Sequence, residues 1–389
     1  MQASLLKKRS EVDMIIVIAD DITGAAELGG VALRYGLRAI VSDDVHVGGQ
    51  CDILIIYTNT RSMKKEQAVA VMEELTAKAL RLDPSLFYKK TDSVLRGHIV
   101  AEMKAQMKVM NVNKALLVPV NPSLGRIIRD GHYYVNGELI GATAFSTDPE
   151  FPATGVDVVR MLGEEQPVTI VPKNGPLPAT GISLGEAETN EEVAAWAKHN
   201  DPSVLMAGGA ALFDALLATA LPFKNKKAGH AHLSSPSVLV SGTAFSKNVE
   251  RIRSCAHLVS YIPAAIFTGS AVRPDYQKWL DEILHRLSTY NTVIIAADNS
   301  ADRKAAPLRL RDEQAEMVRL IFEAWPIKEL MIEGGSTAYS IVKKMLWRSF
   351  VPTHELQQGI VRMEVQGIDD LHLTIKPGSY EWPAEWNFN

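Results

Sequence analysis

Residues 15–30, IIVIADDITGAAELGG, decide the fold predicted for this chain. They open with a short apolar run rich in isoleucine and valine, which is typical of a buried strand in a parallel sheet. Asp20 and Asp21 follow at once, and Thr23 and Gly24 lead into a segment with helical spacing. This order of strand, acidic turn and helix puts polar side chains at the carboxyl end of a strand, where open α/β sheets bind ligands.

These polar residues also allow a purely structural interpretation. Asp21 or Thr23 could simply cap the helix that follows. Two adjacent acids after a hydrophobic strand, with a Thr-Gly pair beside them, favour a binding or catalytic site over a cap alone.

The length and composition are those of a globular protein with more than one domain. The chain has 389 residues, of which 47% are apolar and 22% charged, and its length exceeds one ordinary core. The net charge of −4 gives no reason to expect nucleic acid or an anionic membrane as a partner. Cys51 and Cys255 lie far apart, which argues against a disulfide framework and favours a cytoplasmic location. No apolar run approaches the roughly 20 residues that span a bilayer, and the N-terminus lacks the apolar core of a signal peptide.

The strand-then-helix pattern recurs along the chain. Strands are predicted at 39–42, 53–57, 86–90, 115–120, 203–207, 238–240, 292–296, 329–332 and 371–375. We also expect a helix through Ile99 that Asp92 or Ser93 caps, and a hairpin around Asn136-Gly137. The fold class is therefore α/β, with two domains that each have a mainly parallel sheet flanked by helices. The polar, basic segment near 222–237 predicts a first domain at 1–225, a linker at 226–236 and a second domain at 237–389.

The two halves place different residues at their strand ends. The first half offers charged side chains: Asp20, Asp21, Arg61, Lys90, Asp92 and Arg96. In such a mixture Arg and Lys can hold a carboxylate while an aspartate accepts a hydroxyl proton. The second half offers small neutral residues: Ser241, Gly242, Thr243, Ser246, Gly334, Gly335, Ser336, Thr337, Gly378 and Ser379. Small residues ahead of a helix let a phosphate approach backbone N–H groups, so the pairing indicates phosphoryl transfer from a nucleotide to a small acid.

Several standard motifs are missing. No GxxxxGK[ST] is found, so this is not a P-loop protein of the usual kind, and no GxGxxG follows the first strand. Gly208-Gly209 is better explained by strand-to-helix packing than by phosphate binding. The ten histidines show no HExxH spacing and there is no CxxC, so a structural metal held by the protein is not expected. Magnesium carried with a nucleotide would need no dedicated motif.

The motifs resemble those of the four-carbon acid sugar kinases, once an uncharacterised family. ADDITGAAE is similar to the ADDLTGA motif of that family, and YKKTDSVLRGH to its K-x-D-S-T-L-R-G motif. PVNPSLGR and the DGHYYVNGELI that follows resemble its P-x-x-P-x-x-G-R segment and its HYVNG hairpin. In the second half VSGTAFSKN, EGGSTAYSIV and TIKPGSY look like looser versions of its G-S-x-S, GG-[DE]-T and KSGNFG elements.

This resemblance implies an ATP-dependent kinase of threonate, erythronate, 3-oxo-tetronate or a related acid. The N-terminal domain would bind the sugar acid and the C-terminal domain ATP with Mg²⁺. The implied acid site comprises the catalytic candidates Asp20, Asp21 and Asp92 and the binding candidates Thr23, Gly24, Arg61, Lys90, Ser93, Arg96 and Gly97. The implied nucleotide site comprises Ser241, Gly334, Gly335, Ser336, Thr337 and Gly378.

The nucleotide end departs from the family pattern. Ser336 stands where the family usually has an acid, and Pro-Gly-Ser-Tyr at 377–380 replaces Ser-Gly-Asn-Phe. Gly359-Ile360 lacks the proline-flanked, glycine-rich loop that the family usually has before its last strand. These departures keep open an alternative function, that of a sugar-acid sensor whose nucleotide site has decayed. A hydroxy-acid dehydrogenase using NAD is a third reading, against which the missing GxGxxG weighs.

The mechanism predicted from the sequence leaves its roles open. The carboxylate of the acid would lie against Arg61, Lys90 or Arg96, and one of the three aspartates would deprotonate the attacking hydroxyl. The glycine turns of the second half would hold the ATP phosphates with Mg²⁺ between them. The acid's identity, the hydroxyl that is phosphorylated and the base are not determined. A homodimer is expected only because it is the commonest soluble assembly.

Overall fold

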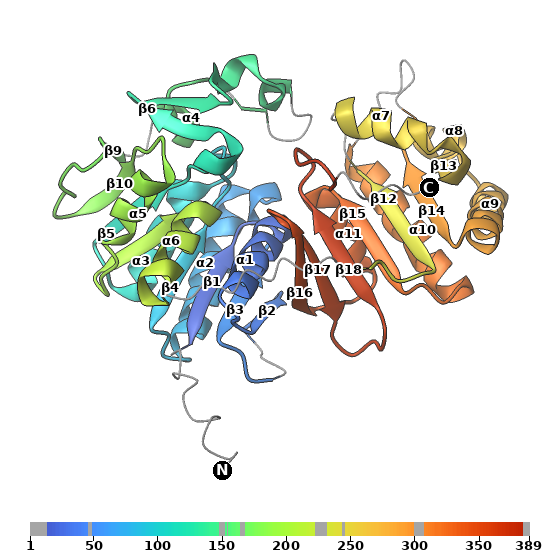
Figure 1. Ribbon diagram of the computed structural model, residues 1–389, viewed down its shortest axis with the longest axis horizontal. Helices are drawn as coiled ribbons and strands as arrows, with labels where there is room; N and C mark the ends of the chain where they lie inside the picture. Colours follow the sequence, from blue (N-terminus) through green and yellow to red (C-terminus); the bar gives the residue numbers. More distant parts are fainter. Residues whose placement is uncertain are drawn as a thin grey trace, which may run out of the picture.

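One sheet of fifteen strands runs through both halves of the part of the chain that the structure describes (Figure 1). The computed structural model describes residues 14–45, 49–147, 152–153, 155–163, 168–221, 232–242, 246–298 and 307–383, with the backbone alone at 246–248 and 307–308. Residues 226–231 of the predicted linker at 226–236, and Thr243, lie outside these residues.

The first half contributes eight parallel strands to this sheet. From the outer edge inward these are β9 (Val168–Val171), β10 (Gly181–Gly185), β5 (Lys114–Val118), β11 (Val204–Gly208), β4 (Leu86–Lys90), β1 (Ile15–Ala19), β3 (Ile53–Tyr57) and β2 (Ala39–Ser42). The helices between them are α1 (Ile22–Arg34), α2 (Lys65–Leu80), α3 (Ile99–Met110), α4 (Val158–Leu162), α5 (Asn190–Ala197) and α6 (Ala210–Ala220). The β1 strand is fully buried, as its unbroken apolar sequence predicts.

A small separate sheet extends the first half. It contains β6 (Arg126–Arg129), β7 (His132–Val135) and β8 (Glu138–Leu139) in antiparallel order. The predicted hairpin at Asn136-Gly137 is confirmed, since that turn joins β7 to β8. Asp130-Gly131 makes a second turn, with both residues at positive φ, between β6 and β7.

The second half has five parallel strands and an antiparallel hairpin. The parallel strands are β13 (Val259–Tyr261), β14 (Thr292–Ala296), β12 (Ser237–Ser241), β15 (Glu329–Glu333) and β18 (His372–Lys376), and β16 (Ser349–Gln357) and β17 (Ile360–Val365) form the hairpin. The helices of this half are α7 (Ser246–Ser254), α8 (Ala264–Thr268), α9 (Arg273–Tyr290), α10 (Pro307–Ala324) and α11 (Gly335–Lys344). The α/β class with a mainly parallel sheet is thus confirmed. None of the helices in the described ranges is long and apolar enough to cross a membrane.

The hairpin β16–β17 joins the two halves. β16 pairs antiparallel with β2 of the first half, in the register Ser349 to Ser42 and Phe350 to Val41. Helix α1 lies on this hairpin, and its two central glycines allow the close approach. A Cβ on Gly29 would lie 2.6 Å from Pro352 Cγ. The ELGG segment at 27–30 therefore packs the two halves together, while the acidic pair Asp20-Asp21 lies beyond the other end of α1.

Two local expectations have different outcomes. The predicted capping of α3 by Asp92 or Ser93 is wrong: His98 occupies the N-cap position, and Asp92 is held by Arg96 instead. Gly208-Gly209 does serve packing, but against the neighbouring strand β5 and not against a helix, because a Cβ on Gly208 would lie 2.1 Å from the carbonyl oxygen of Val118.

Candidate functional site

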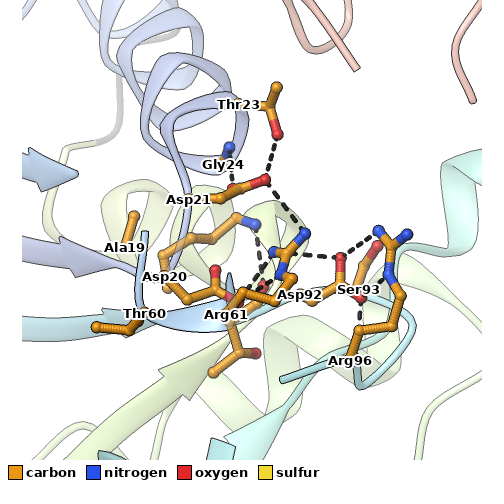
Figure 2. Close-up of polar contacts among 12 residues, drawn as sticks. Ala19, Asp20, Asp21, Thr23, Gly24, Thr60, Arg61, Asp92, Ser93 and Arg96 are labelled. Atoms are coloured by element: carbon orange, nitrogen blue, oxygen red, sulfur yellow. Dashed lines mark hydrogen bonds and ion pairs between the residues drawn. The ribbon is translucent and has the colours of Figure 1, made fainter. Parts of the chain in front are cut away.

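The centre of the candidate site is an arginine surrounded by three aspartates (Figure 2). β1 pairs with β3 on one side and with β4 on the other, so the segments that follow these strands meet at one edge. Asp20 and Asp21 follow β1, Arg61 lies in the short 3₁₀ helix after β3, and Asp92 follows β4. The structure thus brings together the charged residues that the sequence placed at three separate strand ends.

The Arg61 guanidinium contacts all three carboxylates. Its Nη2 lies 2.9 Å from Asp20 Oδ2 and 3.5 Å from Asp92 Oδ1, and its Nη1 lies 3.2 Å from Asp21 Oδ2. At most 14% of any of these side chains is exposed. Gly97 helps to position this arginine, since it has φ +95 and a Cβ there would lie 3.2 Å from Arg61 Cγ.

The three aspartates have different environments. Asp21 caps α1: its side chain accepts from the Gly24 backbone N–H at 2.7 Å and from the Thr23 hydroxyl at 2.6 Å. Burial opposes ionisation, but Arg61, Lys90 and these bonds hold the pKa of Asp21 below its ordinary value. The capping interpretation is therefore correct for Asp21, although the same carboxylate also contacts the central arginine.

Asp92 is tied to a second arginine. Arg96 donates to it from Nε at 2.7 Å and from Nη2 at 2.9 Å, in the bidentate geometry that favours the ionised carboxylate. Despite burial, Arg61 and Arg96 hold the pKa of Asp92 well below its ordinary value.

Asp20 differs from both. Burial raises the pKa of its carboxyl above the ordinary value, and the attraction of Arg61 offsets this only in part. Its Oδ1 is buried and has no hydrogen-bond partner among the residues that the structure describes. Asp20 is thus the one of the three aspartates that combines a raised pKa with an unused oxygen.

Lys90 lies behind the start of α1 and is paired with a residue the sequence did not indicate. Its Nζ is 3.5 Å from Glu27 Oε2 and donates to the Thr91 carbonyl at 3.0 Å. A Cβ on Gly24 would lie 2.8 Å from Asp21 Oδ1 and 3.0 Å from this Nζ, so a larger residue there would displace both side chains. Glu27 in turn accepts a bond from the Tyr380 hydroxyl at 3.0 Å, which links this corner of the site to the second half.

The predicted nucleotide-binding residues gather at the start of α11. Gly334, with φ +99, is the N-cap residue and has no side chain of its own with which to cap this helix. Gly334 N donates to the Lys376 carbonyl at 2.9 Å, so the turn after β18 that contains Gly378 lies beside it. Thr337 is buried against Gly242: a Cβ on that glycine would lie 2.0 Å from Thr337 Oγ1.

Ser241 and Ser336 complete the predicted nucleotide set. The Ser241 hydroxyl donates to Glu333 Oε2 at 2.6 Å, and Glu333 also forms a buried ion pair with Lys376 at 3.5 Å. Ser336 is the second residue of α11, in its first turn. Ser246 begins α7, and its side chain lies outside the description.

The two predicted sites meet at one glycine. A Cβ on Gly335 would lie 3.1 Å from Asp21 Oδ2 and 3.2 Å from Thr23 Cγ2. Helices α1 and α11, from opposite halves, therefore begin next to each other. The N-terminus of α11 therefore faces the acidic turn, although Ile22 and Gly335 are 313 positions apart in the chain.

Sequence reasoning missed several polar residues around this junction. Four of these, Arg126, Glu27, Glu333 and Lys376, are buried and contact predicted site residues, and the fifth, the half-buried Tyr380, contacts Glu27. All lie inside motifs that carry the family resemblance, so the motifs were a signal even though the individual residues were not chosen.

A cavity of about 370 Å³ lies beside the cluster and not within it. It is lined by α1, α5 and α6, and by Asn121, Ser123 and Gln358. Glu27 lines it too, but the three aspartates and Arg61 do not. Within the described ranges, no three His, Cys, Asp or Glu side chains are grouped to hold a metal ion.

Known proteins resemble this chain in sequence and in fold. The family model described as "Sugar-binding N-terminal domain" matches residues 15–245. A D-threonate kinase of Salmonella typhimurium is 30% identical over 159 residues, 40% of this chain and 38% of that protein. A 3-oxo-tetronate kinase of Pseudomonas fluorescens is 24% identical over 414 residues, 93% of both chains. A solved Haemophilus influenzae structure of the DUF1537 family has a TM-score of 0.67 at 16% identity and covers 94% of this chain and 97% of its own.

The family model covers more than half of the chain and includes the strand ends that carry the aspartate cluster. The likeness to the solved structure extends the shared fold to the second half. This chain therefore belongs to the family defined by the sugar-binding N-terminal domain.

Proposed function

We propose that this protein is a kinase that transfers the terminal phosphoryl group of ATP to a hydroxyl of a small sugar acid, of the four-carbon type of threonate, erythronate or their 3-oxo derivatives. The observation that carries the proposal is the contact between Gly335 and the Asp21–Thr23 turn. A helix N-terminus suited to phosphate is thereby next to a cluster suited to a hydroxylated acid. The names of the relatives support the same class of reaction.

Asp20 is proposed as the general base. A base needs a free oxygen and a pKa closer to neutrality than that of an ordinary aspartate, and Asp20 has both features. Asp21 is used by the α1 cap and Asp92 by Arg96. In this proposal Asp21 and Asp92 orient Arg61, while Asp20 accepts the hydroxyl proton as the oxygen attacks phosphorus.

The second half is proposed to bind ATP through backbone N–H groups of the first α11 turn. Gly334 begins this helix with no atom closer than 3.8 Å to a Cβ built on it, so a phosphate could approach the positive end of the helix dipole from that side. The described side chains do not form a metal site of their own, because the three aspartates face Arg61. Magnesium would therefore be held mainly by the nucleotide phosphates, and no step here depends on it.

The proposed division of the chain is an acid-binding domain at 1–225, a linker at 226–236 and a nucleotide-binding domain at 237–389. A homodimer is proposed on frequency alone and is tested by light scattering.

The test of this function is ADP release in the presence of ATP, Mg²⁺ and a panel of four- and five-carbon aldonic acids and their oxo derivatives. We expect release with at least one four-carbon acid. Asp20→Asn should lower kcat by about 10²–10⁴-fold, while Asp83→Asn, a change at an exposed aspartate outside the site, should not. Binding of an acid without any ADP release would refute the kinase and favour a sensor.

A further inference from the structure

The cations of the aspartate cluster already have carboxylate partners. Arg61 contacts three aspartates, and Arg96 is bidentate with Asp92. Lys90 pairs with Glu27. A substrate carboxylate that approached one of them would compete with an acid of the protein. These three residues, which the sequence suggested as carboxylate anchors, are therefore poorly suited to that role.

Arg126 has a different environment. It is only 8% exposed, and its partners are neutral: Nη1 donates to Ser93 Oγ at 2.6 Å and Nη2 to Ser379 Oγ at 3.2 Å. Within the described part of the chain, no carboxylate lies within ion-pair distance of it. Two aromatic rings, those of Phe145 and Tyr380, lie over its guanidinium, at 5.4 and 5.2 Å from their centroids.

A buried cation of this kind requires an explanation. Removing a charge from water is costly unless an opposite charge and hydrogen bonds compensate it. The two hydroxyls use two of the five N–H donors of a guanidinium, and the aromatic faces give a weaker attraction than an ion pair. The remaining donors lie in the plane of the fork, which is the geometry that binds a carboxylate through two parallel bonds.

The position of Arg126 is also informative. It begins β6, and its backbone pairs with Asn121 after β5, so a short turn fixes the side chain. Ser93 directly follows Asp92 of the cluster, whereas Ser379 belongs to the turn after β18 in the second half. Arg126 thus spans the junction of the two halves, next to the proposed reaction centre.

We propose that Arg126 binds the carboxylate of the sugar acid, a role that rests on the proposed function for the identity of the ligand. Phe145 and Tyr380 hold the guanidinium plane, and Ser93 and Ser379 orient the fork from both halves. Binding of the carboxylate here leaves Arg61 free to order the aspartates. Because Ser379 and Tyr380 come from the second half, the anion site is complete only when the two halves are together.

The test measures binding directly, so it does not require turnover. Calorimetry compares wild type, Arg126→Gln and Arg126→Lys with the aldonic acid panel, with inorganic phosphate, and with threitol, a neutral four-carbon polyol. We expect Arg126→Gln to weaken acid binding by about 10- to 100-fold, the range for a hydrogen-bonded charged group, and to leave threitol binding unchanged. Arg126→Lys keeps the charge but loses the planar pair of donors, so its affinity for the acid should lie between those of wild type and Arg126→Gln.

The matched control is Arg129→Gln. Arg129 lies at the other end of β6 and its side chain is 49% exposed and paired with Glu188 at 3.2 Å, so acid binding should not change. If the circular dichroism melt shows that Arg126→Gln does not fold, the test uses Arg126→Lys instead. A ratio of acid affinity to threitol affinity in Arg126→Lys that equals the wild-type ratio overturns the proposal.

The other outcomes separate this proposal from the proposed function. Acid binding that is unchanged in Arg126→Gln while inorganic phosphate binding falls would overturn it and assign Arg126 to the transferred phosphoryl group. Acid binding by wild type that is lost in Arg126→Gln, without ADP release, would support Arg126 and refute the kinase. A wild-type chain that bound no acid of the panel would overturn both.

Discussion

Gly335→Ala is the most direct test of the contact between the two halves of the site. The new methyl group would lie 3.1 Å from Asp21 Oδ2, 3.2 Å from Thr23 Cγ2 and 3.3 Å from Thr23 Oγ1. These distances are a few tenths of an ångström shorter than ordinary contacts, so the Asp21 turn must move by about that amount. The Asp21 carboxylate is held by Gly24, Thr23 and Arg61, and its movement therefore disturbs the whole cluster.

The effects on stability and on catalysis should differ. Alanine is better than glycine inside a helix by about 1 kcal/mol, and a weakened Asp21 cap would cost about 0.5–2 kcal/mol. The net change in the free energy of unfolding should thus stay within about 1 kcal/mol. A misplacement of 1 Å near reacting groups can lower a rate about 10²-fold, so a shift of a few tenths should lower kcat/KM by about tenfold.

The assay is ADP release kinetics on Gly335→Ala, with a thermal melt of the same sample. Gly49→Ala serves as the control, because nothing lies within 4 Å of a Cβ at that position. A Gly335→Ala protein with wild-type kcat/KM would refute the reasoning that the start of α11 and the Asp21 turn form one reaction site. A protein that melted far below wild type would show that the contact is mainly structural.

Three further predictions follow from the charges. Because burial raises the pKa of Asp20, kcat/KM should decrease as the pH falls through a value above the ordinary aspartate pKa of about 3.9. The pH profile of Asp20→Asn should lack this decrease, and a decrease that persists would show that another group is responsible. The depressed pKa of Asp92 gives a stabilising contribution that is present above the unfolded value and lost as pH falls through the folded value. The difference in urea-unfolding free energy between wild type and Asp92→Asn should therefore shrink below about pH 4, and a constant difference would contradict the ion-pair account. Glu333→Gln should lower the free energy of unfolding by about 3–5 kcal/mol, because it leaves Lys376 buried without its carboxylate; Glu323→Gln, at an exposed ion pair, should change it by less than about 1 kcal/mol.

Local structure was largely predictable from the sequence. The strands at 53–57 and 292–296 agree residue for residue with β3 and β14, since short apolar runs between turn residues are a local signal. The hairpin at Asn136-Gly137 is similar, because positive φ is required there whatever the rest of the chain does. The family motifs extended this to the charged residues after β1 and β4, whereas Arg61 after β3 was indicated by its place at a strand end.

The hairpin β16–β17 could not be predicted in the same way. Its first strand contains Pro352 and alternates irregularly between buried and half-buried residues, and the pairing shifts register twice. Its role also depends on a partner far away in the chain, the β2 strand, which no local pattern indicates. The continuity of the sheet across the two halves was therefore visible only in the structure.

The sequence by itself determined which chemical groups stand at the ends of which strands, because side-chain type and strand position are both local properties. Only the tertiary structure decided which partner each of those groups has. It showed that Asp21 is a cap and that Asp92 is bound to Arg96. Among the residues that the structure describes, it also showed that Asp20 keeps an oxygen without a hydrogen-bond partner and that the buried Arg126 has only neutral partners. Burial and charge pairing depend on segments hundreds of residues apart, and the contact of Gly335 with Asp21 exists only once both halves have folded together.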